Sequence, residues 1–427
     1  MLVEFSVANF LSFKNRVTFS MVASNDTELQ ESNVVQTEKH RLVKSAVVYG
    51  ANASGKSNLL SAIRFMRRMV LTSSKDTQAN EEIDVTRFLL STDCDEKPST
   101  FEMVFLHNQT QYRYGFEVDQ KRIHSEWLFS VHTSKEAEYF VREGTKITVN
   151  PARFKEGKGL EERTRENALF LSVCAQFNGE VSKTLLAWFQ NLRFVHGVAP
   201  LRLMDVTVDR LKEPKQKQRI LDITRVADPG IVDFSLREEK IIVTLDELPK
   251  AMPEEMKKDL VKDGVTRIEL KTTHRKLDGE GKDAGAELFD LEKHESSGTQ
   301  RLVKLAGPLL DTLETGKVLV VDELDARLHP LLTRLIVNLF NSAANRSNAQ
   351  LIFATHDAGL LTNTIFRRDQ IWFTEKGPTG ASSLYSLVEL KGVRKEASFG
   401  KDYILGKYGA IPFIGDPASF LCEGNHD

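Results

Sequence analysis

The sequence has few cysteines. Its 427 residues include only Cys94, Cys174 and Cys422, which stand far apart. No two of them have the short spacing of a zinc-binding pair, and three isolated thiols cannot form the disulfide framework of a small secreted domain. This scarcity excludes a disulfide scaffold and a cysteine-based metal site, and it indicates a reducing compartment.

Long apolar runs are also missing. No stretch approaches the roughly 20 apolar residues that a helix needs to cross a bilayer. The opening MLVEFSVANFLSF has no basic segment ahead of its apolar residues and alternates as a strand does, which is not the pattern of a secretory signal. We therefore expect a cytoplasmic protein that does not contact a membrane.

An excess of charge of one sign is a third absence. The formal net charge is −2, so the molecule as a whole is not a basic surface for nucleic acid. Residues 210–219 form a basic, proline-interrupted segment, which could contact nucleic acid or a partner protein locally. The same segment can equally be the solvated face of a helix.

The clearest motif present is GANASGKS at residues 50–57, which fits the P-loop pattern G-x-x-x-x-G-K-[ST]. It follows the apolar run SAVVYG and opens an apolar-periodic segment, the strand-then-helix context that the motif requires. Glycines let successive N–H groups point at phosphates, the lysine neutralises phosphate oxygens, and the Ser57 hydroxyl can hold Mg²⁺. We expect ATP to be contacted by Gly50, Asn52, Ala53, Ser54, Gly55, Lys56, Ser57 and Asn58.

A second motif is VLVVDE, which ends in Asp322 and Glu323. Four apolar strand-forming residues precede the acids, so both carboxylates are expected at the ligand edge of a parallel sheet. Asp322 can hold Mg²⁺, and Glu323 can polarise the attacking water as a catalytic base. The alternative is an ordinary acidic helix cap.

Two further candidates are His356 and the turn HESSGTQRL. His356 ends the strand-like LIFATH, where a histidine could sense a γ-phosphate and take part in catalysis; a plain polar residue at a strand end is the alternative. Ser296 and Gly298 open an apolar-periodic helix, whose N-terminus can bind an anion or simply be capped by Ser296 or Ser297.

The elements predict an α/β fold of the P-loop type. Alternating runs from residue 100 to 149 indicate an antiparallel sheet, and the segment after residue 298 alternates helix and strand. We expect an N-terminal ATPase lobe at residues 1–150, a mainly helical insertion at 151–270, and a C-terminal ATPase lobe at 271–427. Prolines and the lack of sustained heptads argue against a long coiled coil in the insertion.

The order of P-loop, insertion, Ser-x-Gly helix start, apolar-Asp-Glu and strand-His resembles the ATP-binding-cassette (ABC) ATPases, in particular the RecF/SMC-like heads. Ser296 and Gly298 fall on the serine and second glycine of the family's L-S-G-G-Q signature, and His329 stands where the D-loop has Asp. The resemblance implies that the signature of one subunit caps ATP held by another, and hence a homodimer or higher oligomer.

A narrower resemblance covers nearly the whole chain. YGANASGKSNLL, HESSGTQRL, DELDARLHP, FATHD and GKYGAIPFIGD look like the small RloA-like relatives of OLD proteins, found in bacterial phage-defence operons. It implies a nucleotide-driven switch that controls a separate effector, commonly a nuclease, while FLCEGNHD is only a faint match to a Toprim opening. The alternative function is a RecF-like ATPase that binds DNA directly in repair or recombination.

Overall fold

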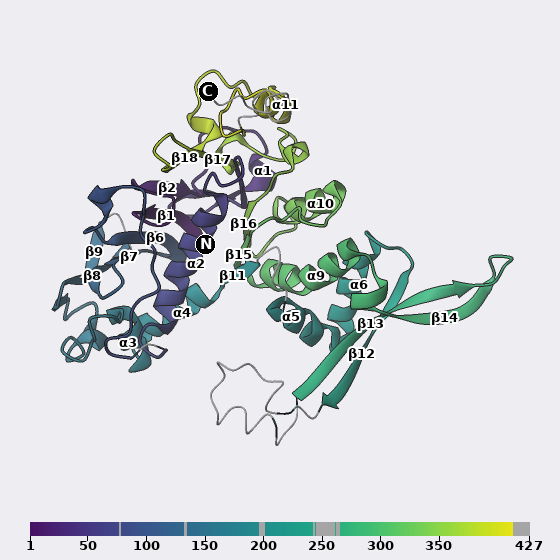
Figure 1. Cartoon of the computed structure of the whole chain (residues 1–427), viewed down its shortest axis with the longest axis horizontal. Coiled ribbons are helices and arrows are strands. Elements are labelled where there is room, and N and C mark those ends of the chain that lie inside the picture. Colours follow the sequence, from purple (N-terminus) through teal and green to yellow (C-terminus); the bar gives the residue numbers. More distant parts are fainter. Residues whose placement is uncertain are drawn as a thin grey trace, which may run out of the picture. The chain divides into compact units, whose positions relative to one another are not determined.

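The computed structural model describes residues 1–76, 78–131, 135–195, 201–241, 244, 261 and 265–412. The chain divides into two compact units (Figure 1). The first contains Met1–Gly197, Thr312–Ala326 and Thr333–Asp427, and the second contains Val198–Asp311 and Arg327–Leu332. Among the helices of the described residues, none combines the length and the apolar character that crossing a membrane requires.

The first unit contains an antiparallel sheet with the strand order β10-β9-β8-β7-β6-β1-β2. Side chains alternate between buried and partly exposed along β6, as expected of a sheet with one covered face. The strands are β1 (Leu2–Ala8), β2 (Val17–Ser20), β6 (Ser99–His107), β7 (Thr110–Val118), β8 (Ile123–Val131), β9 (Glu136–Glu143) and β10 (Lys146–Val149). The predicted antiparallel sheet at residues 100–149 is therefore confirmed.

A second sheet of the first unit has the order β11-β15-β16-β5-β17-β18. Neighbours from β11 to β17 are parallel, and β18 is antiparallel to β17. The strands are β11 (Leu192–Val195), β15 (Val318–Val321), β16 (Gln350–Ala354), β5 (Ser45–Tyr49), β17 (Ile371–Lys376) and β18 (Ser382–Ser386); β3 (Val34–Gln36) and β4 (Arg41–Val43) form a small separate pair.

Helix α2 (Lys56–Thr72) shares one hydrophobic core with both sheets. Its apolar residues recur at helical spacing, and the ring of Phe65 lies 4.7 Å from that of Phe101 on β6. The other helices of this unit are α1 (Gln30–Asn33), α3 (Phe170–Gln176), α4 (Glu180–Gln190), most of α10 (Pro330–Phe340) and α11 (Phe399–Ile404). The helix that follows the P-loop is therefore fixed between two sheets.

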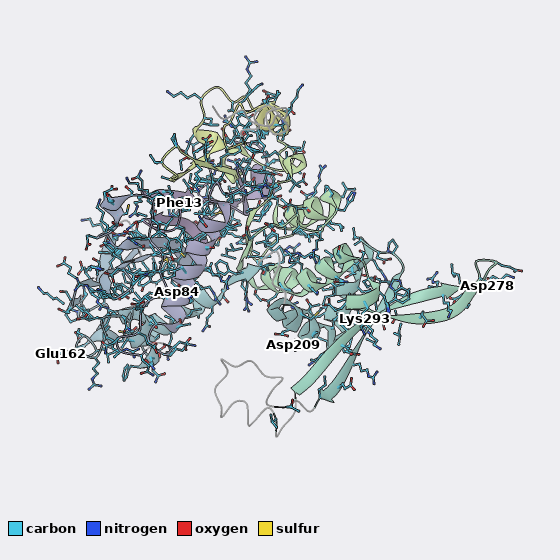
Figure 2. All side chains as sticks on the ribbon, viewed as in Figure 1. Phe13, Asp84, Glu162, Asp209, Asp278 and Lys293 are labelled. Carbon is cyan, nitrogen blue, oxygen red and sulfur yellow. The ribbon has the colours of Figure 1, made fainter. Side chains whose placement is uncertain are left out.

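The second unit combines helices with an antiparallel sheet, in which β13 lies between β12 and β14 (Figure 1). The turn between β13 and β14 contains Asp278, labelled at the far end of this hairpin in Figure 2. Among the described residues its elements are α5 (Leu201–Leu211), α6 (Pro214–Arg225), β12 (Ile231–Ile241), β13 (Val265–Leu277), β14 (Asp283–Asp290), α8 (Leu291–His294) and α9 (Ser297–Thr315) as far as Asp311.

Helix α9 tolerates an internal proline because a neighbouring hydroxyl compensates for it. Pro308 has no N–H to donate to the carbonyl of Lys304. The Thr207 hydroxyl of α5 lies 3.2 Å from that carbonyl and donates to it, and it also accepts from the N–H of Gly307 at 3.2 Å. A Cβ on Gly307 would lie 2.5 Å from the Thr207 Cα, so only glycine permits this approach.

Two elements differ from the sequence interpretation. Within the segment predicted to be mainly helical, α4 ends at Gln190, and Leu192–Val195 forms β11 because these residues pair in parallel with β15. The segment predicted as a mainly helical insertion also contains β12 and the start of β13. FLCEGNHD and the end of GKYGAIPFIGD lie outside the described residues.

Candidate nucleotide site

The P-loop sequence forms a turn between a buried strand and a helix. Every residue of β5 is buried, and α2 begins at Lys56, directly after Gly55 with φ 118°. A Cβ on Gly55 would lie 2.6 Å from the Ser382 Oγ, and one on Gly50 would lie 2.4 Å from the Thr374 carbonyl oxygen. Both glycines are therefore required by close packing as well as by the backbone.

The P-loop is fastened to residues that its motif does not contain. The Ser54 and Thr374 hydroxyls are 2.7 Å apart, and the Ser382 hydroxyl donates to the Ser54 carbonyl at 2.6 Å. The Asn58 amide donates to the Ser12 hydroxyl at 2.8 Å. No sequence signal marks Ser12, Thr374 or Ser382, because they come from distant parts of the chain.

Lys56 is held by the P-loop itself. Its Nζ donates to the carbonyls of Gly50 at 2.8 Å and Ala51 at 3.0 Å, and the residue is buried. Burial lowers the pKa of Lys56, and carboxylates on a neighbouring strand end oppose that shift. An ammonium in this position is a concentrated positive charge inside the loop that the motif assigns to phosphate.

The parallel sheet brings the predicted groups to one edge. Val321 of β15 pairs with Phe353 of β16, and Ala354 pairs with Val48 of β5, so the carboxyl ends of three strands lie together. Asp322, His356 and Gly50 all follow those ends within two residues. This is the edge at which open α/β sheets bind ligands.

Electrostatic interactions link these groups. Burial lowers the pKa of His356, and the positive charge of Lys56 lowers it further. The carboxylates of Asp325, Glu323 and Asp322 act in the opposite direction. The same three carboxylates raise the pKa of Lys56 against its burial. The structure therefore brings Lys56, Asp322, Glu323 and His356 together, as the motifs predict.

Asp325 is a member of this cluster that the sequence interpretation did not select. Its Oδ1 is buried, and among the described residues it has no hydrogen-bond partner. The third acid of DELD is the signal that could have identified it, since Asp325 stands only four positions past the end of β15, in the turn that follows the strand. A buried carboxylate oxygen is costly unless something compensates it.

The turn that carries the acids has an unusual backbone. Glu323 is exposed and has φ 53°, in the left-handed region that side chains rarely adopt. The Leu324 N–H donates to the Ala354 carbonyl at 3.1 Å, which ties the turn to β16. The carboxylate of Glu323 is thus presented to solvent at the sheet edge, where a water can reach it.

Ser296 and Gly298 belong to the second unit, not to the unit that holds the P-loop. The Ser296 hydroxyl accepts from the Thr299 N–H at 3.1 Å, so it caps α9. A Cβ on Gly298 would lie 2.9 Å from the Arg327 carbonyl oxygen. The plain N-cap geometry is confirmed, and any contact with nucleotide stays a prediction.

His329, which replaces the expected Asp of the D-loop, also serves as a cap. Its Nδ1 accepts from the Leu331 N–H at 3.2 Å, and its carbonyl accepts from the Leu332 N–H at 2.8 Å. Pro330 follows as the first residue of α10, a position that needs no N–H donor. This histidine therefore has a structural role that does not depend on a nucleotide.

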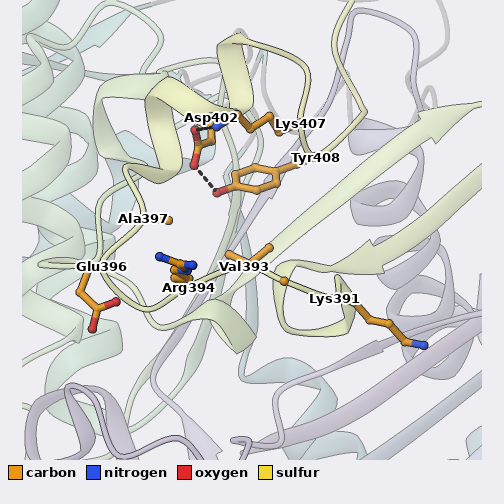
Figure 3. A pocket seen from close by; sticks show the side chains of 9 residues that line it. Lys391, Val393, Arg394, Glu396, Ala397, Asp402, Lys407 and Tyr408 are labelled. Atoms are coloured by element: carbon orange, nitrogen blue, oxygen red, sulfur yellow. Dashed lines mark hydrogen bonds and ion pairs between the residues drawn. The ribbon is translucent and has the colours of Figure 1, made fainter.

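A hollow in the first unit lies among other residues. Its volume is about 480 Å³, and its lining includes Lys391, Arg394, Glu396 and Asp402. Asp402 accepts from Lys407 at 2.6 Å and from the Tyr408 hydroxyl at 3.3 Å (Figure 3). None of the predicted site residues lines this hollow, so it is distinct from the candidate nucleotide site.

Strand, glycine loop, lysine-led helix and acidic strand end together define a P-loop nucleoside-triphosphatase fold. Residues 45–362 match the family described as "AAA domain, putative AbiEii toxin, Type IV TA system". The match spans well over half of the chain, and the protein therefore belongs to this family. No curated protein matches the chain.

Solved structures similar to this chain include heads of SMC proteins. The SMC head domain from Thermotoga maritima is 12% identical with a TM-score of 0.40, covering 90% of this chain and 98% of that one. An SmcHead bound to the C-winged helix domain of ScpA is 15% identical with a TM-score of 0.40, covering 90% and 97%. An Smc head with an extended coiled coil, bound to the C-terminal domain of ScpA derived from Pyrococcus furiosus, is 14% identical with a TM-score of 0.39, covering 90% and 96%.

Proposed function

We propose that this protein binds ATP with Mg²⁺ at the P-loop edge, hydrolyses it, and uses the ATP-bound state to control an effector. The observation that carries the proposal is the gathering of Lys56, Asp322, Glu323 and His356 at one edge of the parallel sheet, where their charges influence one another. The family match supports the nucleotide part of the proposal.

Ser57 and Asp322 are the proposed Mg²⁺ ligands. Both offer oxygen atoms, which this hard cation prefers, and Ser57 is exposed at the second position of α2. When bound, the ion supplies neutralisation of the phosphate charge. Lys56 contributes a further positive charge, and N–H groups of residues 52–57 bind the phosphate oxygens.

Glu323 is the proposed base. Its exposed carboxylate stands one residue past the proposed metal ligand, within the same turn, where it can orient a water and accept its proton. Burial and the charge of Lys56 lower the pKa of His356, which favours a neutral ring. A neutral imidazole can donate one hydrogen bond to the γ-phosphate and accept one from water.

Ser296 and Gly298 are proposed to act on ATP held by a second copy of the chain. The N-terminus of α9 carries a positive dipole end, and ATP between two subunits would join each P-loop to the partner's α9. ATP would then favour the dimer and ADP would not. Such a protein is a nucleotide-driven dimerisation switch.

A cytoplasmic role in bacterial phage defence, through a separate nuclease, is the biological part of the proposal. It is supported by the toxin–antitoxin description of the family and by the resemblance to RloA-like relatives of OLD proteins. The RecF-like alternative has less support, because two cations of the basic segment are already paired. Lys217 lies 2.7 Å from Asp233, and Arg210 lies 3.3 Å from Asp311.

Binding of a fluorescent ATP analogue with Mg²⁺ tests the proposal directly. Lys56→Ala should abolish binding, because it removes the positive charge inside the loop. Lys97→Ala is the matched control, since Lys97 is an exposed lysine of the same unit. Unchanged affinity in Lys56→Ala would contradict the assignment of the P-loop.

A further inference from the structure

A cluster of metal-ligating side chains lies in the second unit, not in the unit that holds the P-loop. Asp228 is in the turn between α6 and β12, His274 is on β13, and Glu295 is in the loop between α8 and α9. One ligand atom from each residue lies within 4.8 Å of the other two. Lys293, labelled in Figure 2, lies in α8 two residues before Glu295.

The imidazole at the centre of the cluster is held in place. Its Nε2 lies 2.7 Å from the Glu295 Oε1, and its ring stacks on Phe289 with centroids 4.5 Å apart. The Thr272 hydroxyl also bonds to the Glu295 Oε1, and the Gly230 N–H donates to the Asp228 Oδ1 at 2.9 Å. The bonds from Thr272 and Gly230 orient the two carboxylates, as outer hydrogen bonds do at a metal site.

The charge of the cluster is unbalanced. The side chain of Glu295 is only 4% exposed and that of His274 is 15% exposed. Within the described residues, no lysine or arginine forms an ion pair with Asp228 or Glu295. Two carboxylates so close together, one of them buried, repel each other, and a divalent cation would compensate both.

The spacing suits one ion. Ligands bonded at about 2.1 Å to a common ion lie at most about 4.2 Å from one another. The observed limit of 4.8 Å is close enough for small side-chain rotations to close the site. One imidazole with two carboxylates is a ligand set for a borderline transition-metal ion such as Zn²⁺, Mn²⁺ or Co²⁺, rather than for Ca²⁺.

We propose that Asp228, His274 and Glu295 bind one divalent transition-metal ion, which joins the turn after α6, the sheet and the loop before α9. Glu295 directly precedes Ser296, so the bound ion would fix the start of α9. This binding requires no nucleotide, and it is independent of the proposed ATPase activity.

Titration of the full chain with Co²⁺ tests the proposal. The protein is first treated with a chelator and kept free of nucleotide and Mg²⁺, and the visible absorption of bound Co²⁺ is followed. One equivalent should bind per chain, Zn²⁺ should displace it, and either ion should raise the melting temperature. An absence of Co²⁺ absorption at one equivalent would overturn the proposal.

Asp228→Asn is the decisive variant. Its amide oxygen can keep the bond from the Gly230 N–H, and the bond between His274 and Glu295 does not involve it. If the cluster is only a set of hydrogen bonds, this change should leave the melting temperature unaltered. If it binds a metal, the affinity for Co²⁺ should fall about 10-fold or more. Wild-type Co²⁺ affinity in Asp228→Asn therefore contradicts the metal site.

His274→Gln should lose Co²⁺ binding while His294→Gln keeps it. His294 is the matched control because it lies on α8 and its ring also contacts Phe289, with centroids 5.6 Å apart. Lys56→Ala should bind Co²⁺ as the wild type does, which separates this site from the P-loop. Equal losses in His274→Gln and His294→Gln would contradict the proposal.

Discussion

Strands β5 and β14 differ in burial, and they illustrate a difference between the two units. Every residue of β5 is buried, whereas β14 is exposed from Asp283 to Leu288 at the edge of its sheet. The predicted nucleotide-site residues follow β5 and its parallel neighbours, whose strands share one hydrophobic core. The second unit contributes a capped helix start and an exposed hairpin, which suits a surface that meets other molecules.

The largest effect is expected when the proposed catalytic base of the first unit is removed without changing the structure of that unit. Glu323→Gln keeps the shape of the side chain and removes the base, so ATP turnover should fall about 10²- to 10⁴-fold while ATP affinity is retained. Phosphate release and nucleotide binding are the measurements. Glu138→Gln, an exposed change on β9, is the control, and wild-type turnover in Glu323→Gln would remove Glu323 from the mechanism.

The next experiment tests whether Ser296 of the second unit contacts ATP that is bound to the P-loop of another subunit. Ser296→Arg should lower turnover by about 10²-fold, as expected when a phosphate-binding group is lost. Mixing Ser296→Arg with Lys56→Ala should restore part of the activity, because one site of a mixed dimer has neither lesion.

The control for that mixture combines Lys56→Ala with Asp322→Asn. Both lesions then belong to the unit that holds the P-loop. Every proposed site of a mixed dimer has one of them, so activity should stay absent. If both mixtures behave alike while the chains associate, the proposed action between subunits is wrong.

A third prediction measures how tightly the P-loop is packed. Gly55→Ala should destabilise the first unit by about 1–3 kcal/mol and weaken ATP binding, because its Cβ would lie 2.6 Å from the Ser382 Oγ. Gly144→Ala has a positive φ of 60° but nothing within 4 Å of its Cβ, so it reports backbone strain alone. If urea unfolding shows the same loss of unfolding free energy in Gly55→Ala and Gly144→Ala, close packing does not contribute at Gly55.

A smaller effect is expected in the second unit. Thr207→Val removes the hydroxyl that bonds to the Lys304 carbonyl beside Pro308, which should cost about 1–2 kcal/mol. Amide exchange within α9 should speed up while exchange in β5 stays unchanged. Thr184→Val is the control, since that hydroxyl donates to Glu180 of its own helix. Faster exchange in both elements would show that the units do not unfold separately.

The smallest expected effect is electrostatic. Lys56→Met removes a positive charge that lowers the pKa of His356, so the pKa of His356 should rise. Titration of the histidine ring protons by NMR measures it. Lys97→Met should leave the pKa of His356 unchanged, and no rise in Lys56→Met would contradict the interaction.

Local patterns were sufficient to predict the main elements of the candidate site. SAVVYG, GANASGKS and VLVVDE predict a strand, a phosphate loop and an acidic strand end, and the structure contains β5, the turn at residues 50–55 and β15 there. These motifs are short and contiguous, so their local geometry follows from residue type. The same reasoning placed a helix start after Ser296.

Long-range contacts could not be predicted in this way. Ser54 and Ser382 are 328 positions apart, and no periodicity links them. β11 was missed because LRFV continues the apolar pattern of α4, and only pairing with β15 makes it a strand. Asp325 was passed over because its burial depends on the folded sheet edge.

The left-handed backbone of Glu323 has a consequence for how this protein would respond to selection. A φ of 53° costs a glutamate roughly 1–3 kcal/mol, whereas glycine or asparagine adopts it more readily. Replacing the glutamate with either residue relieves that strain and removes the carboxylate. Screening variants for thermal stability alone would therefore favour chains that lack the proposed base, a trade-off between stability and the proposed activity contained in one residue.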